Sequence, residues 1–189
     1  MKVIDFTTTD IEKACETLIS QFDCQFDLVV GIAEGGRLMA EIISQKLELP
    51  LLLVIRQRKL TQYKSKSKNI LKYIPKKILN LIRIIENRYC EFLLKIKKQA
   101  EQPDEIKILS NELSFFENPQ IKNILLVDDA IDSGSTVRNV EKFLQTKNNG
   151  WNIKIAVITQ SFKQPVRKAD YQLYNRVLVR FPWSNDFKK

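Results

Sequence analysis

The sequence of 189 residues contains no histidine. This absence excludes Ser–His and Cys–His catalytic pairs, histidine general bases and zinc sites that require imidazole ligands. The three cysteines, Cys15, Cys24 and Cys90, are odd in number and never spaced as Cys-x-x-Cys. We therefore expect no disulfide framework and no metal cluster, and we expect a reducing, cytoplasmic setting. The sequence also lacks a signal-peptide stretch and any uncharged apolar run of about 18 residues, so no transmembrane segment is expected.

Acidic residues are scarce in one part of the chain. Residues 56–100 contain 14 Lys and Arg residues but only two acids, Glu86 and Glu91, which gives this segment a charge of +12. Because the whole chain carries +9, the remaining residues sum to −3. Any electrostatic argument about partners therefore concerns this segment alone.

Outside the basic segment, short apolar runs alternate with stretches of helical spacing. The pattern predicts helices at 8–22, 37–47 and 136–145, and strands at 27–32, 51–55, 106–109, 122–127 and 154–159. This alternation is typical of an α/β fold, a Rossmann-like parallel sheet flanked by helices. In such folds, ligands bind at the carboxyl ends of the strands.

Residues 56–105 interrupt the alternation and are expected to form a basic helical insertion within a single domain, 1–189. A long helix is predicted after Pro75, because apolar residues recur at helical spacing from Ile78 to Ile96 with Lys and Arg on the other side. This helix has three possible roles: it binds RNA or DNA, it anchors the protein on a membrane surface, or it packs against the core or a second subunit. Packing is favoured, with a homodimer as its expected form.

A strand followed by acids and small hydroxyl residues is the most informative motif. After the apolar run Ile124–Val127 come Asp128 and Asp129, and then the turn Asp132-Ser-Gly-Ser-Thr136 at the start of a helix. The N–H groups and hydroxyls of such a turn can hold a phosphate group. The acid pair suits ligand hydroxyls and a bound Mg²⁺, so the motif fits a sugar phosphate with a diol. Ordinary helix capping explains only one or two of these residues.

This stretch closely resembles the phosphoribosyl pyrophosphate (PRPP) signature of type I phosphoribosyltransferases. The resemblance implies that Asp128 and Asp129 bind the ribose hydroxyls, directly or through Mg²⁺, and that the turn holds the 5′-phosphate. In purine-specific members, the acid at the position of Asp132 lies beside the base and is a proposed general base. The implied catalytic residues are therefore Asp128, Asp129 and Asp132, and the implied phosphate-binding residues are Asp132, Ser133, Gly134, Ser135 and Thr136.

A second stretch is similar to the pyrophosphate loop of the same family, in which a strand ends in a small residue, a basic residue and Gly-Gly. Here the loop is Ala33, Glu34, Gly35, Gly36 and Arg37. The sequence departs from the pattern at Glu34, where many relatives carry Arg or Lys, and a carboxylate is unfavourable beside a pyrophosphate. Either Arg37 supplies the charge, or Glu34 points away, or the pyrophosphate chemistry is weakened.

The C-terminal part resembles that of xanthine–guanine and hypoxanthine phosphoribosyltransferases. By this resemblance, residues 160–189 form a small C-terminal hood, Lys163 reads the base and Trp183 stacks on it. Stacking on an indole suits any planar base. The flexible loop that closes over PRPP in relatives falls in the insertion, with Arg56, Arg58 and Lys59 as candidates for contacting the pyrophosphate.

The function implied is transfer of the 5-phosphoribosyl group from PRPP to a nitrogenous base, with a purine favoured, and release of pyrophosphate. The implied cofactor is Mg²⁺. The alternative is a non-catalytic, PRPP-sensing regulator that binds nucleic acid through the basic helix, because a fold alone does not determine a function. Nucleic-acid binding is not favoured, because one side of that helix is strongly apolar.

Overall fold

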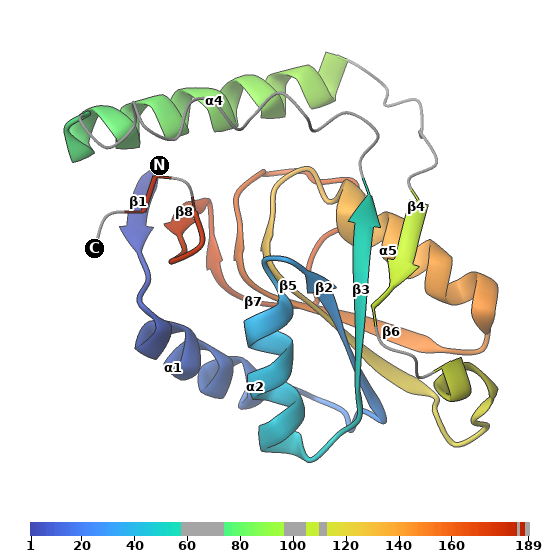
Figure 1. Ribbon diagram of the computed structural model, residues 1–189. Coiled ribbons are helices and arrows are strands. Elements are labelled where there is room, and N and C mark those ends of the chain that lie inside the picture. The colour runs from blue at the N-terminus through green and yellow to red at the C-terminus, as the bar shows by residue number, and fades with distance from the viewer. Residues whose placement is uncertain (58–73, 97–104, 110–112, 185, 188–189) are drawn as a thin grey trace.

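The central sheet has six strands in the order β4-β3-β2-β5-β6-β7 (Figure 1). The computed structural model describes residues 1–57, 74–96, 105–109, 113–184 and 186–187. The alternating core of the fold consists of β2 (Leu28–Ala33), α2 (Arg37–Leu47), β3 (Leu51–Gln57), β5 (Asn123–Ile131), α5 (Ser135–Lys147) and β6 (Asn152–Gln160). These elements confirm the predicted α/β class with a parallel sheet.

Helices cover both faces of the sheet, so its central strands are buried on both sides. One face packs against α1 (Thr8–Ile19) and α2, through residues such as Leu18 and Met39. The other face packs against α5 through Val137, Val140 and Leu144. This double burial explains why β2 and β5 appear in the sequence as continuous apolar runs.

One edge of the sheet differs from a wholly parallel arrangement. The edge strand β4 (Glu105–Ile108) pairs antiparallel with β3. The chain leaves β3 at its carboxyl end, forms the insertion, and returns to the sheet at the same end, so the next strand must run back along β3. Residues 58–73 and 97–104 of the insertion lie outside the described part of the chain.

Residues 160–189, expected from the sequence to form a hood, divide between two places. β7 (Tyr171–Asn175) extends the central sheet beside β6, whereas β8 (Val177–Arg180) pairs with β1 (Lys2–Asp5) from the other end of the chain. The small second sheet is therefore built from both termini. Its central polar residue is Arg180, which is only 1 % exposed and bonds to Asp5 and Asp186.

The predicted long helix forms as α4 (Lys76–Ile96) and lies across the carboxyl ends of the strands, apart from the sheet (Figure 1). Its inward side is mainly polar and its apolar side is exposed. The expectation that the apolar side packs against the core of the same chain is therefore wrong. Helical spacing shows which residues share a face, but only the polar partners on the body of the protein decide which face turns inward. Among the described helices, none combines the length and apolarity needed to cross a membrane.

Candidate active site

The two loops singled out in the sequence lie next to each other, because β2 and β5 are parallel neighbours in the sheet. Loop 33–37 follows β2, and its glycines touch the strand that carries the acid pair. A Cβ atom added at Gly35 would collide with the carboxylate of Asp129, and one added at Gly36 would collide with the backbone of Val127 and Asp128. Glycine is therefore required at both positions for this close approach.

The turn before α5 has the form of an anion-binding site. Gly134 is the N-cap of α5, with φ of 80°, and it has no side chain to cap the helix. The hydroxyls of Ser133 and Ser135 are 2.9 Å apart, and the backbone N–H of Val166 donates to the Ser133 carbonyl. Because a helix N-terminus favours negative charge, this turn is suited to a phosphate group.

The acid pair lies where β5 meets the cavity. Asp128 is buried, and one of its carboxylate oxygens accepts a hydrogen bond from the Asp129 N–H. Burial raises the pKa of Asp129 to about 6, helped by the charge of Asp132 and opposed by a hydrogen bond from the indole N–H of Trp183. A nearby cation would favour the ionised form of this carboxyl group.

The donor set at this acid pair fits Mg²⁺. Carboxylate oxygens are the ligands that Mg²⁺ takes from proteins, and one or two carboxylates with substrate phosphates complete many such sites. Within the described residues, no group of three or more acidic, cysteine or histidine side chains forms a complete metal cage. Asp128 and Asp129 would therefore hold the ion together with the substrate.

Loop 33–37 carries one acidic and one basic residue. Glu34 is exposed, and Arg37 pairs with Glu41 one turn further along α2, at 2.8 Å. From the end of β3, the Arg56 guanidinium donates to the Thr136 hydroxyl at 2.7 Å and so reaches the phosphate turn. Arg58 and Lys59, the other two candidates for closing on the pyrophosphate, lie outside the described residues.

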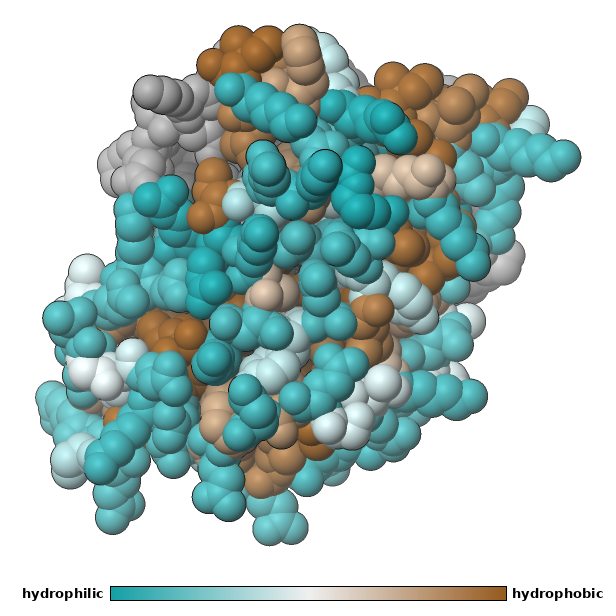
Figure 2. All heavy atoms as spheres, turned by 180° about the vertical axis from the view of Figure 1, so that it is seen from behind, coloured by the Kyte–Doolittle hydropathy of each residue, from teal (hydrophilic) through white to brown (hydrophobic). Residues whose placement is uncertain are grey.

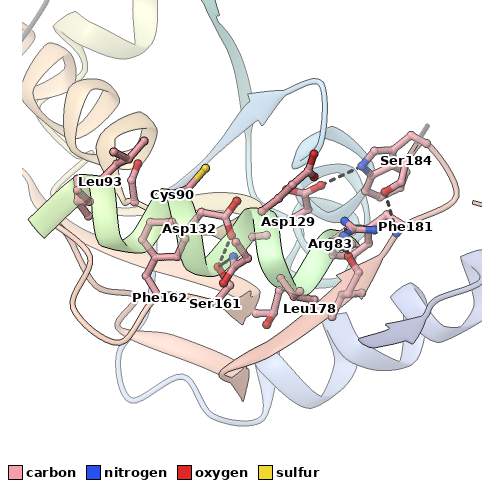
Figure 3. Close-up of a pocket in the computed structure, with 18 residues that line it drawn as sticks. Arg83, Cys90, Leu93, Asp129, Asp132, Ser161, Phe162, Leu178, Phe181 and Ser184 are labelled. Atoms are coloured by element: carbon pink, nitrogen blue, oxygen red, sulfur yellow. Dashed lines mark hydrogen bonds between the residues drawn. The ribbon is translucent and has the colours of Figure 1, made fainter. Parts of the chain in front are cut away.

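A cavity of about 760 Å³ opens beside the acid pair (Figure 3). Its floor includes Asp129 and Asp132 from the end of β5, and its walls include Phe162, Phe181 and Trp183. Helix α4 forms the roof of the cavity, with Arg83, Glu86, Asn87, Cys90, Leu93 and Leu94. The sequence places a closing loop in this insertion, but helical spacing does not show which residues of the helix line the cavity, because polar and apolar side chains both do so.

A chain of hydrogen bonds joins the roof to the floor. The Ser161 hydroxyl donates to the carboxylate of Asp132 (Figure 3), so the Ser161 oxygen offers only lone pairs to Asn87. The Asn87 amide nitrogen accordingly donates to Ser161 at 2.9 Å, and the Asn87 Oδ1 atom is buried without a partner. The orientation of the Asp132 carboxylate therefore depends on Ser161 and, through it, on α4.

The two predicted base-binding residues have different positions. Trp183 lines the cavity, where its ring stacks on Phe181 with centroids 5.1 Å apart and an interplanar angle of 1°. Lys163 is not among the residues that line the cavity; its side chain is exposed and its backbone N–H donates to Glu91. The structure therefore brings Trp183 to the site but not Lys163.

Removal of the Ser161 hydroxyl should weaken the attachment of α4. In Ser161→Ala, the buried amide nitrogen of Asn87 loses its acceptor, and a buried unsatisfied group costs about 1–3 kcal/mol. We expect the free energy of unfolding to fall by this amount in chemical denaturation. The control is Ser20→Ala, whose hydroxyl bonds to a backbone carbonyl on the exposed end of α1 and should cost less. Equal losses in the two variants would contradict a special role for Ser161.

Replacement of Lys163 should have little effect on binding of the base. Because its side chain is exposed and outside the cavity wall, we expect Lys163→Ala to change the Michaelis constant for the base by no more than about twofold, as is usual for a solvated surface charge. Steady-state kinetics at saturating PRPP would measure this. A tenfold increase in this Michaelis constant would show that Lys163 does contact the base.

Comparison with known proteins identifies the family. The model of the phosphoribosyl transferase domain matches residues 7–185. A purine phosphoribosyltransferase from Pyrococcus horikoshii is 17 % identical with a TM-score of 0.61, and covers 97 % of this chain and 94 % of its own. The xanthine-guanine-hypoxanthine phosphoribosyltransferase of Helicobacter pylori is 16 % identical with a TM-score of 0.60, over 96 % and 90 % of the two chains. The orotate phosphoribosyltransferase of Aeropyrum pernix is 13 % identical with a TM-score of 0.51, over 89 % and 73 %.

No curated protein matches the chain in sequence. The likeness to the solved structures extends over nearly the whole chain for the first two, and it establishes the fold. The family model covers almost all of the sequence, including both loops and the acid pair. The chain therefore belongs to the phosphoribosyl transferase domain family and is a phosphoribosyltransferase of the type I fold.

Proposed function

We propose that this enzyme transfers the 5-phosphoribosyl group from PRPP to a purine base, in the cytoplasm, as a step of purine salvage. The observation that carries the proposal is the meeting of three features at one cavity: Asp129 of the acid pair, Asp132 and Ser133 of the phosphate turn, and the ring of Trp183. The aromatic wall supports a planar base, and the purine enzymes among the similar structures favour a purine.

Each end of PRPP has a matching group in the site. The turn from Asp132 to Thr136 receives the 5′-phosphate, and Asp128 and Asp129 bind the ribose hydroxyls and Mg²⁺. Loop 33–37 contacts the pyrophosphate, and its glycines let the loop lie directly against the acid pair. Bound Mg²⁺ supplies positive charge that stabilises the leaving pyrophosphate. The protein contributes mainly by positioning and by its fixed dipoles.

The reaction forms a bond between a base nitrogen and C1 of the ribose, while the bond from C1 to the pyrophosphate oxygen breaks. Trp183 holds the base by stacking, and Asp132 accepts the proton that the base nitrogen releases. Ser161 is a positioning residue for Asp132, because its hydroxyl donates to that carboxylate. The roof residues of α4 keep water from the reacting atoms.

The proposal is tested by incubating the full chain with Mg²⁺-PRPP and single bases while pyrophosphate is measured. We expect release with guanine, xanthine or hypoxanthine and none with orotate. The matched control omits the base, which separates transfer from hydrolysis of PRPP. Binding of PRPP without pyrophosphate release for any base would instead support the non-catalytic regulator. The homodimer expected from the sequence stays a prediction.

A further inference from the structure

The outward side of α4 carries a stripe of large apolar side chains that are 40 to 63 % exposed. The α4 stripe consists of Ile78, Leu81, Ile82, Ile85, Tyr89, Phe92 and Ile96. On a helix with 3.6 residues per turn, these positions fall within an arc of about 100°. Apolar residues gather along the upper edge of the molecule, where α4 lies (Figures 1 and 2). An exposed apolar patch of this kind marks an interaction site.

Polar contacts on the opposite side of α4 hold the stripe outward. The inward residues bond to the N-terminal strand and to several places in the C-terminal part of the chain. The stripe could not turn inward unless these contacts broke. They are Lys76 with Asp5, Asn80 with Arg180, Arg83 with Asp186 and the Val179 carbonyl, Asn87 with Ser161, and Glu91 with Arg176. The exposure of the stripe is therefore a consequence of how α4 docks.

Positive charge borders the stripe on one side. Lys77, Arg88 and Lys95 are exposed and fall within about 20° of each other on the helix, next to the apolar arc. The only acid on the opposite border is Glu86, and α4 as a whole has five basic residues and two acids. A broad apolar face with basic residues beside it is the pattern of helices that lie in the interface of anionic membranes.

We propose that α4 docks this enzyme on an anionic lipid surface, with the stripe inserted among the lipids and the basic row on the headgroups. A helix of 21 residues is about 30 Å long, and its place at the outer edge of the fold allows it to lie flat on a bilayer. Because the inward side of the same helix roofs the cavity, docking sets the active site directly beneath the membrane surface.

Charge and size favour lipid over the other occupants. Antiparallel pairing with a second copy would place the two basic rows against each other, and a stable dimer uses about 20–30 residues per partner, whereas the stripe has seven. Nucleic acid would pair with the basic row but would leave the aliphatic members of the stripe, such as Ile85 and Leu81, without an apolar partner.

The first test measures cosedimentation of the full chain with vesicles at about 0.15 M salt. We expect binding to phosphatidylcholine vesicles that contain phosphatidylglycerol, and none to phosphatidylcholine alone. Ile85→Ser with Phe92→Ser should lower the affinity about a hundredfold, because two inserted apolar side chains are lost. Leu109→Ser, an exposed leucine outside α4, is the control and should bind as the wild type does. The melting temperature of the double variant should not change, since both side chains are exposed.

The second test removes charge. Neutralising Lys77, Arg88 and Lys95 to Gln should lower the vesicle affinity about a hundredfold, at roughly fivefold for each charge. The control carries the same charge change at exposed lysines away from α4, with Lys13, Lys122 and Lys168 replaced by Gln, and should keep most of the affinity.

Four results would overturn the proposal. The first is no binding of the wild type to anionic vesicles. The second is binding by the stripe variant or the charge variant that equals that of the wild type. The third is a dimer that dissociates in the stripe variant without lipid, which would assign the stripe to a second copy. The fourth is RNA or DNA binding that is lost in the charge variant while vesicles are not bound, which would assign the basic row to nucleic acid.

Discussion

Replacing Asp128 and Asp129 together by Asn is expected to abolish binding of Mg²⁺-PRPP and to leave the fold intact. Both carboxylates lie at the carboxyl end of β5, and in the proposed site they are the ligands of the ribose hydroxyls and Mg²⁺. Isothermal titration calorimetry with Mg²⁺-PRPP would measure the loss. We expect no detectable heat in the variant under conditions that saturate the wild type.

The stability of this variant separates lost binding from unfolding. The pKa of Asp129 is raised to about 6 in the folded protein, above its ordinary value of 3.8, so the ionised carboxylate opposes folding at higher pH. Asn carries no such charge, and we expect the melting temperature at pH 8 to be unchanged or slightly higher. The control is Glu12→Gln with Glu117→Gln, an equal charge change at exposed acids, which should keep PRPP binding. Unchanged affinity in the aspartate variant would contradict the assigned PRPP site.

The replacement Trp183→Ala is expected to raise the Michaelis constant for the base by about 5- to 150-fold and that for PRPP much less. The ring of Trp183 lines the cavity and stacks on Phe181, and loss of stacking on a base costs about 1–3 kcal/mol. Steady-state kinetics with each substrate varied in turn would distinguish the two constants.

The variant Trp183→Phe serves as the matched control for stacking. It keeps an aromatic face toward the base but removes the indole N–H that donates to Asp129 at 2.9 Å. We expect base binding to be largely retained, and any effect to fall on PRPP through Asp129. If Trp183→Ala changes only the PRPP constant or the melting temperature, Trp183 acts on the acid pair or on the fold and not on the base.

The residues of the candidate site could be identified from the sequence because they lie in two short stretches. A buried strand, an acid pair and a glycine–hydroxyl turn occupy 13 consecutive residues, 124–136, and each has its own chemical signature. The same holds for loop 33–37. Their meeting was also predictable in outline, since the carboxyl ends of parallel strands share one edge of the sheet.

The roof of the cavity could not be predicted in the same way. Asn87 and Ser161 are separated by 74 positions, and neither belongs to a recognisable motif. The resemblance to purine phosphoribosyltransferases implied that Lys163 reads the base, but in the structure its backbone N–H donates to Glu91 and its side chain is exposed. Such contacts depend on how the insertion packs, which local spacing does not specify.

The sequence by itself determined the α/β class, the PRPP motif and the existence of a long amphipathic helix, because burial on both faces, turn chemistry and helical spacing act over short stretches. Only the tertiary structure decided which side of that helix faces inward. Ion pairs and hydrogen bonds from Arg83, Asn87 and Glu91 to distant parts of the chain fix the polar side over the cavity and leave the apolar stripe outside. The orientation follows from these long-range partners, and helical periodicity is the same whichever side is buried.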